Sequence, residues 1–174
     1  MIHDIDGSRR EILIQALSLG LFAATPGLIS PVYALRDIAA KLPPGRSIYK
    51  LKGSVHVDGI PATIDTKINA NSWIRTGKSS RIIFVVGSDA FILRENSELR
   101  MNGKDLLIGG MRILTGKLLS VFGKRTQQHQ IQTTTATIGI RGTGIYVESE
   151  QERSYVCTCY GQTIITANDD PNSY

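Results

Sequence analysis

Two cysteines in the segment SYVCTCYGQ are the residues best placed to do chemistry. Cys157 and Cys159 are two positions apart, so a strand presents both thiols on one face, together with Tyr155. Cα atoms at that spacing are ~6.5 Å apart, near the limit of a disulfide, and a bridge needs local distortion that Gly161 would supply. Three outcomes stay open: a local disulfide or two structural thiols, redox chemistry or a bond to a partner, and a metal or haem contact.

Other motifs for metal binding or catalysis are absent from the sequence. A zinc site takes about four ligands, whereas His56 and His129 are isolated, and a lone strand histidine is usually a surface or edge residue. The sequence has no Gly-x-Ser-x-Gly elbow, no His-Glu-x-x-His pair, no phosphate loop and no close carboxylate pair on an apolar strand. Asp89, Glu95 and Glu98 surround one turn, where charges are usually solvated. We therefore expect no enzyme activity and no cofactor other than a metal or haem at the cysteine pair.

A second segment, TATIGIRGTGIYVE, changes the phase of its strand pattern. Ile138 and Ile140 alternate on even numbers, whereas Ile145 and Val147 alternate on odd numbers. Because strand side chains alternate with a period of two, the chain must contain a bulge, a bend or a tight turn between them. The interruption consists of Arg141, Gly142, Thr143 and Gly144, whose glycines accept the unusual backbone angles that it requires.

Arg141 falls on the face opposite Ile138 and Ile140, next to this interruption. A bulge leaves backbone carbonyls unpaired, and a guanidinium group carries enough donors to satisfy several of them. We therefore predict a structural role for Arg141, with binding of a ligand as the alternative.

The first 34 residues have the layout of an export signal. Arg9 and Arg10 precede an apolar stretch over 12–24, and Val32 to Ala34 form a small-x-small-like cleavage site, so we place the cut after Ala34. The run SRREIL also resembles the twin-arginine export signal, with two departures from its pattern. A cleaved signal implies a periplasmic or secreted protein, and an uncleaved membrane anchor is the alternative.

The 174 residues suit one domain with a basic net charge of +5. Removing residues 1–34 takes away two arginines and three acidic residues, which leaves the remainder slightly more basic. This charge favours weak attraction to anionic envelope polymers. Because the charges are scattered, with no run longer than Lys124-Arg125, we do not expect nucleic-acid binding.

Residues 35–49 are predicted to form a linker or short helix, because Leu35, Ile38, Ala39 and Leu42 recur at helical spacing before Pro43-Pro44. From Gly53 onward, glycine-centred turns separate short β-branched or apolar runs, which indicates an all-β sandwich, barrel or solenoid-like roll of short strands. The predicted strands are 54–57, 80–86, 90–93, 112–114, 118–122, 129–133, 155–159 and 163–166.

One short sequence pattern occurs twice in this region. The runs IRTGKSSRIIFVVG, from Ile74, and ILTGKLLSVFG, from Ile113, share Ile-x-Thr-Gly-Lys followed by an apolar strand and a closing glycine. Two copies are too few for a repeat architecture, so we interpret them as two equivalent hairpins.

The order of these features resembles the FecR family of periplasmic domains. The shared pattern is WIRTGKSSRIIFVV, then GSDAFILRENSELRM and LLIGGMRILTGKLLSVFG, and last the alternating strand that enters Arg-Gly-Thr over 136–143. The resemblance covers about residues 50–165 and implies an all-β, FecR-like sandwich or roll. It divides the chain into a signal peptide (1–34), a linker or short helix (35–49), a β domain (50–167) and a polar tail (168–174).

In its best-known members this domain belongs to a membrane protein that senses an outer-membrane transporter and controls a sigma factor. Only about eleven residues precede the apolar stretch here, so the sigma-regulating part is not expected on this chain. What the resemblance implies is a non-catalytic module of envelope sensing or signalling that binds a periplasmic or outer-membrane protein. We expect binding through a strand edge or through the bend at Gly142 to Gly144. The alternative is a small-ligand, metal or redox module centred on Cys157 and Cys159.

Overall fold

The computed structural model describes residue 42, residues 45–123 and residues 129–170, and this part of the chain is all-β without a helix. The expected signal peptide, the predicted helix before Pro43 and the end of the polar tail lie outside the described residues. Residues from Pro44 onward form one compact unit. Its strands are β1 (Ile48–Lys52), β2 (Val55–Val57), β3 (Ile60–Pro61), β4 (Trp73–Thr76), β5 (Arg81–Val86), β6 (Asp89–Leu93), β7 (Glu98–Lys104), β8 (Leu107–Val121), β9 (His129–Gln132), β10 (Ala136–Ser149) and β11 (Ser154–Ala167). The first strand begins two residues ahead of the expected boundary at 50.

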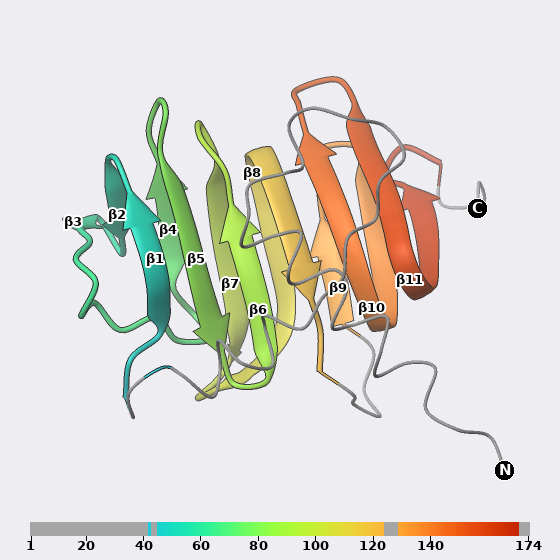
Figure 1. Ribbon diagram of the computed structural model, residues 1–174. Helices are drawn as coiled ribbons and strands as arrows, with labels where there is room; N and C mark the ends of the chain where they lie inside the picture. The colour runs from blue at the N-terminus through green and yellow to red at the C-terminus, as the bar shows by residue number, and fades with distance from the viewer. Residues whose placement is uncertain (1–41, 43–44, 124–128, 171–174) are drawn as a thin grey trace, which may run out of the picture. The chain divides into compact units, whose positions relative to one another are not determined.

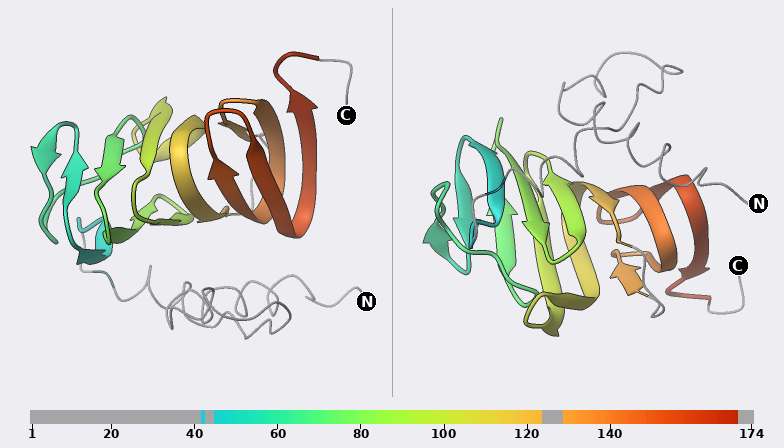
Figure 2. Two further views of the ribbon diagram at one scale, coloured as in Figure 1. Left: turned by 90° about the horizontal axis from the view of Figure 1, so that it is seen from above. Right: turned by 60° about the horizontal axis from the view of Figure 1, so that its bottom comes forward.

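The strands form one continuous sheet that is folded into two layers (Figure 1). Layer I contains β1, β5 and β6, followed by the second half of β8, the second half of β10 and the first half of β11. Layer II contains β3, β2, β4 and β7, followed by the first half of β8, β9, the first half of β10 and the second half of β11. Seen from above, the long strands curl from one layer into the other (Figure 2).

Three strands of 14 or 15 residues, β8, β10 and β11, belong to both layers and bend where they cross. Gly116 in β8 has φ +98° and Gly161 in β11 has φ +88°, which glycine adopts without the penalty that other residues incur. In β10 the register shifts between Arg141 and Gly144 and again before Ile145. The predicted interruption is therefore present, and it keeps the isoleucines of both halves buried.

The expectation of short strands alone is wrong for these three elements. The predicted pairs 112–114 with 118–122, and 155–159 with 163–166, are each one bent strand, because Gly116 and Gly161 bend the backbone without ending the strand. The two runs that share Thr-Gly-Lys are not hairpins either. In the first run β4 pairs with β2 and β7 while β5 pairs with β1 and β6, and the second run lies largely within the single strand β8. In both runs the Thr-Gly-Lys segment carries the chain from layer II to layer I.

Hydroxyl side chains satisfy the backbone where the chain crosses between the layers. The Ser54 amide donates to Ser80 Oγ at 2.8 Å, the Ser97 amide to Thr76 Oγ1 at 3.0 Å, and the Lys117 amide to Ser97 Oγ at 3.0 Å. Backbone donors left unpaired in such buried bends are costly, so each hydroxyl replaces a missing ladder bond. This series links successive crossings along one rim.

The core lies between the layers and contains an aromatic stack. The ring centroids of Phe84 and Phe91 are 5.0 Å apart, those of Phe91 and Phe122 are 5.9 Å apart, and those of Phe122 and His129 are 5.7 Å apart. His129 is buried and not at the surface or edge as expected, because its position in β9 faces this stack. Asp89 is also buried and not solvated, with its Oδ1 accepting from the Gly123 amide at 3.0 Å.

Candidate functional site: the edge of β11

Three strands of the described sheet pair on one side only: β1, β3 and β11. Natural proteins protect such edges with lysine, proline or short strands, because unpaired backbone groups invite another strand. The edge strand β1 carries Lys50 and Lys52, and β3 has two residues, the second of which is Pro61. The 14 residues of β11 include no charged residue and no proline. The β11 edge therefore lacks the usual protection.

The β11 edge is U-shaped, since both of its ends reach Thr135. The Thr135 hydroxyl donates to Ser154 Oγ at 2.8 Å, and the Asn168 amide donates to the Thr135 carbonyl at 2.9 Å. The hydroxyls of Thr158 and Thr163 are 2.6 Å apart and join the two arms close to the bend. The arms are consequently held in place before any partner arrives, which lowers the entropic cost of binding.

Apolar side chains are exposed along both arms. Tyr155, on the layer I arm, is 58% exposed and meets the Tyr146 ring edge-on at a centroid distance of 6.3 Å. On the layer II arm, Ile164 is 60% exposed and Ile165 is 41% exposed. Adjacent strand residues point to opposite faces, so the two isoleucines flank the unpaired backbone on both sides. Pockets for alternate side chains beside a free backbone are what strand addition uses.

The cysteine pair lies on the layer I arm as two half-buried free thiols. Cys157 is opposite Tyr146, but the register of β10 and β11 skips Cys159, since Thr158 faces Ile145 and Tyr160 faces Gly144. Cys159 Sγ is 3.9 Å from the Cys157 carbonyl oxygen. Burial, and then the nearby Cys157, raises the pKa of the Cys159 thiol to about 12. Cys159 is therefore protonated at neutral pH, which disfavours nucleophilic attack and metal ligation.

No cluster of three or more histidine, cysteine or acidic side chains suited to a metal ion occurs in the described ranges. His56 is on β2 and His129 is in the core, so neither joins the cysteines. A local disulfide or two structural thiols, redox chemistry or a bond to a partner, and a metal or haem contact therefore all stay predictions for the cysteine pair.

The raised pKa of Cys159 has a consequence for stability. A thiol that ionises at about 9 when unfolded and at about 12 when folded favours the folded chain fully below pH 9. That contribution is lost as the pH rises from about 9 to about 12, because only the unfolded state then releases its proton. We expect the urea midpoint of the parent to fall as the pH is raised from about 8 to 10.5, and the midpoint of Cys159→Ser to fall less over the same range. An equal fall in the two proteins would contradict the burial of this thiol.

The second predicted site, Arg141 to Gly144, is adjacent to the cysteine arm. Arg141 faces Gln162 and Gly144 faces Tyr160, so the interruption of β10 is beside the bend of β11. Arg141 is exposed on the face opposite the buried Ile138 and Ile140. Its role at the carbonyls of the bend stays a prediction. The structure thus brings together the two sites that the sequence indicates.

Sequence reasoning missed two features of this region. Binding through a strand edge is expected from the sequence, but the strand that forms the edge was missed, although the charge-free run over 154–167 is visible in the sequence. A row of arginines and amides on the outer face of layer II was also missed, because its members come from three different strands, β7, β8 and β9. Only the pairing register brings them side by side.

Comparison with protein-family models, with curated proteins and with solved structures found no match for this chain. The resemblance to the FecR family accordingly stays a prediction from the sequence. Within the ranges that the structure describes, no helix has the length and the hydropathy needed to cross a membrane.

Proposed function

We propose that this chain is a non-catalytic, FecR-like periplasmic module that binds a protein partner by strand addition at β11. The observation that carries the proposal is the 14-residue edge without charge or proline, flanked by the exposed Tyr155, Ile164 and Ile165. The export-like start of the sequence and the basic charge agree with a role in envelope sensing or signalling. The partner supplies an extended, mostly uncharged segment.

The geometry limits what this segment can be. Each arm of the U is six or seven residues long, which is the length of an ordinary strand, so a partner strand of about six residues covers one arm. The layer II arm offers Ile164 and Ile165 on its two faces and is the better site for alternating apolar side chains. Backbone hydrogen bonds supply affinity there, while the isoleucines supply register.

A charge placed on this arm should block the partner. Ile164→Lys adds a solvated cation at a 60% exposed position, and a lysine on an edge opposes pairing with another strand. We expect at least a ~10-fold loss of partner captured from an envelope fraction, which corresponds to about 1.4 kcal/mol. Quantitative mass spectrometry of the captured protein measures this loss.

Ile60→Lys is the matched control, because Ile60 is 69% exposed on the edge strand β3. Both variants should keep the melting temperature of the parent. Unchanged capture by Ile164→Lys, or an equal loss in Ile60→Lys, would contradict the proposal. Replacing Cys157 and Cys159 by serine should leave capture intact, whereas a redox or ligand module centred on the thiols requires its loss.

A further inference from the structure

The outer face of layer II presents a continuous row of mostly polar side chains. Cross-strand pairing places one residue from each of six neighbouring strands in register: Trp73, Arg100, Arg112, Gln132, Thr137 and Thr166. Neighbouring strands are about 4.8 Å apart, so the row extends for roughly 24 Å. A row of this length matches an extended polymer better than a single small anion.

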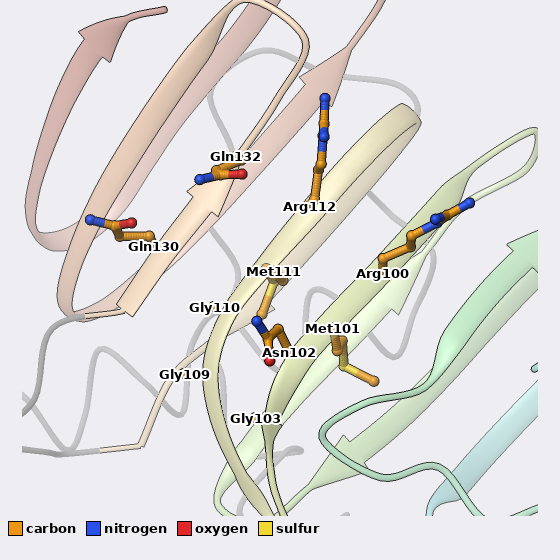
Figure 3. A pocket seen from close by; sticks show the side chains of 10 residues that line it. All are labelled: Arg100, Met101, Asn102, Gly103, Gly109, Gly110, Met111, Arg112, Gln130 and Gln132. Atoms are coloured by element: carbon orange, nitrogen blue, oxygen red, sulfur yellow. The ribbon is translucent and has the colours of Figure 1, made fainter. Parts of the chain in front are cut away.

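A hollow of about 420 Å³ is open beside the middle of this row (Figure 3). Gly109 and Gly110 of β8 form part of its lining and bring no side chains, while Asn102, Gln130 and Gln132 contribute amides. A Cβ atom added at Gly110 would have its nearest neighbour, the Gln130 carbonyl oxygen, at 3.5 Å, which is ordinary contact. The hollow thus exists because glycine is there, and a larger side chain would fill it without a clash at Cβ.

Two arginines on neighbouring strands flank this hollow, and their side chains extend away from each other (Figure 3). Arg100 and Arg112 are direct cross-strand partners, an arrangement that is destabilising for like charges. Arg100 has Glu98 Oε1 at 3.5 Å, and its guanidinium is 4.6 Å from the centroid of the Trp73 ring. Arg112 is exposed. Carboxylates bound by these arginines would offset the repulsion and accept paired hydrogen bonds.

The stacking of Trp73 argues against a nucleic acid. Arg75 is 4.7 Å and Arg100 is 4.6 Å from the centroid of its ring, and Trp73 Nε1 donates to Glu98 Oε1 at 2.9 Å. The ring is already engaged by these neighbours, whereas single-stranded nucleic acid needs free aromatic faces for its bases. Amide side chains, by contrast, both donate to and accept from hydroxyl groups.

We propose that the outer face of layer II binds an acidic polysaccharide, which lies across the strands along the row from Trp73 to Thr137. Its carboxylates pair with Arg100 and Arg112, and its hydroxyls pair with Asn102, Gln130 and Gln132. This site is separate from the β11 edge proposed for the protein partner. A failure of one proposal leaves the other standing.

Binding of polygalacturonate, followed by titration calorimetry, tests this site. Arg100→Gln with Arg112→Gln should weaken binding at least ~10-fold, since two charge-assisted contacts are lost. Lys50→Gln with Lys52→Gln is the matched control, because it removes the same charge from exposed residues of β1. Gly110→Leu should weaken binding as well, because it fills the hollow and leaves the charge unchanged. Melting temperatures of all variants confirm that they fold.

Four results obtained with polysaccharides and the variants would overturn the proposal. They are no binding of polygalacturonate, equal binding of neutral dextran of matched length, an equal loss in the lysine control, and unchanged binding in Gly110→Leu. Tighter binding of a single-stranded oligonucleotide than of polygalacturonate would also overturn it. Binding that falls as salt is raised, with the loss confined to the arginine and glycine variants, would support it.

Discussion

Replacing Gly116 by alanine is expected to lower the free energy of unfolding by about 3 kcal/mol or more, a large part of the 5–15 kcal/mol typical of a domain. Gly116 has φ +98°, a conformation that L side chains rarely adopt. A Cβ atom there would be 2.1 Å from Ser97 Oγ and 2.5 Å from Ser97 Cα. Because the second atom is backbone, a side-chain rotation cannot relieve the clash. Urea unfolding measures the loss.

Gly59→Ala separates the two causes of this loss. Gly59 has φ +83°, but a Cβ atom there would meet nothing within 4 Å, so the substitution costs the backbone strain alone, about 1–2 kcal/mol. If the two substitutions cost the same, the crossing of β8 does not pack against Ser97 as described. A failure of Gly116→Ala to fold, together with a folded Gly59→Ala, agrees with the account.

Replacing Phe91 by alanine should cost about 3–5 kcal/mol. Phe91 is 1% exposed and packs between the rings of Phe84 and Phe122 at the centre of the core. Its removal opens a cavity that cannot close, because β6 is hydrogen-bonded to β5 on one side and to β8 on the other. Urea unfolding is again the measurement, with the midpoint falling while the slope stays constant.

A substitution at Ser120, the cross-strand partner of Phe91, is expected not to lower stability. Ser120 is fully buried, and its hydroxyl has no hydrogen-bond partner in the part of the chain that the structure describes. Ser120→Ala removes this unpaired group, so we expect stability to be unchanged or to rise by about 1 kcal/mol. A marked loss in Ser120→Ala would show that the hydroxyl is paired and that this part of the core differs from the description.

The β class and the positions of several strands could be predicted from sequence because the pattern is local, although no predicted run covers β1, β3, β4 or β7. The runs 80–86 and 90–93 lie within a residue of β5 and β6, since turn residues bound each apolar segment. The phase change between Ile140 and Ile145 likewise requires a bulge whatever the fold. Such inferences depend on periodicity, which neighbouring residues alone determine.

The crossings could not be predicted, because a glycine inside a bent strand has the same local sequence as one in a turn. Gly116 and Gly161 look like the ends of strands, yet β8 and β11 continue through them. Pairing with distant strands decides whether such a glycine bends a continuous strand or ends it. The run of Thr76, Gly77 and Lys78 shows the same ambiguity, since its function as a crossing follows from which neighbours β4 and β5 have.

The candidate site was predicted in part. The sequence draws attention to Arg141 and to the cysteines, but it does not show that β10 and β11 place them side by side. The strand β11 is an edge because, in the described part of the chain, it pairs with β10 alone. No local sequence pattern contains this information. The register skip at Cys159 similarly depends on the pairing of β11 with β10. The two-residue spacing of the cysteines predicts a regular strand and cannot reveal this skip.

Amide hydrogen exchange with and without the captured partner tests strand addition at β11 most directly. In the chain alone, amides of β11 that point away from β10 should exchange quickly, because alternate residues of an edge strand lack a partner. Binding should slow exchange within 154–167 by about 100-fold or more and leave β1 and β3 unchanged. Protection on β1 or β3 with none on β11 would contradict the account.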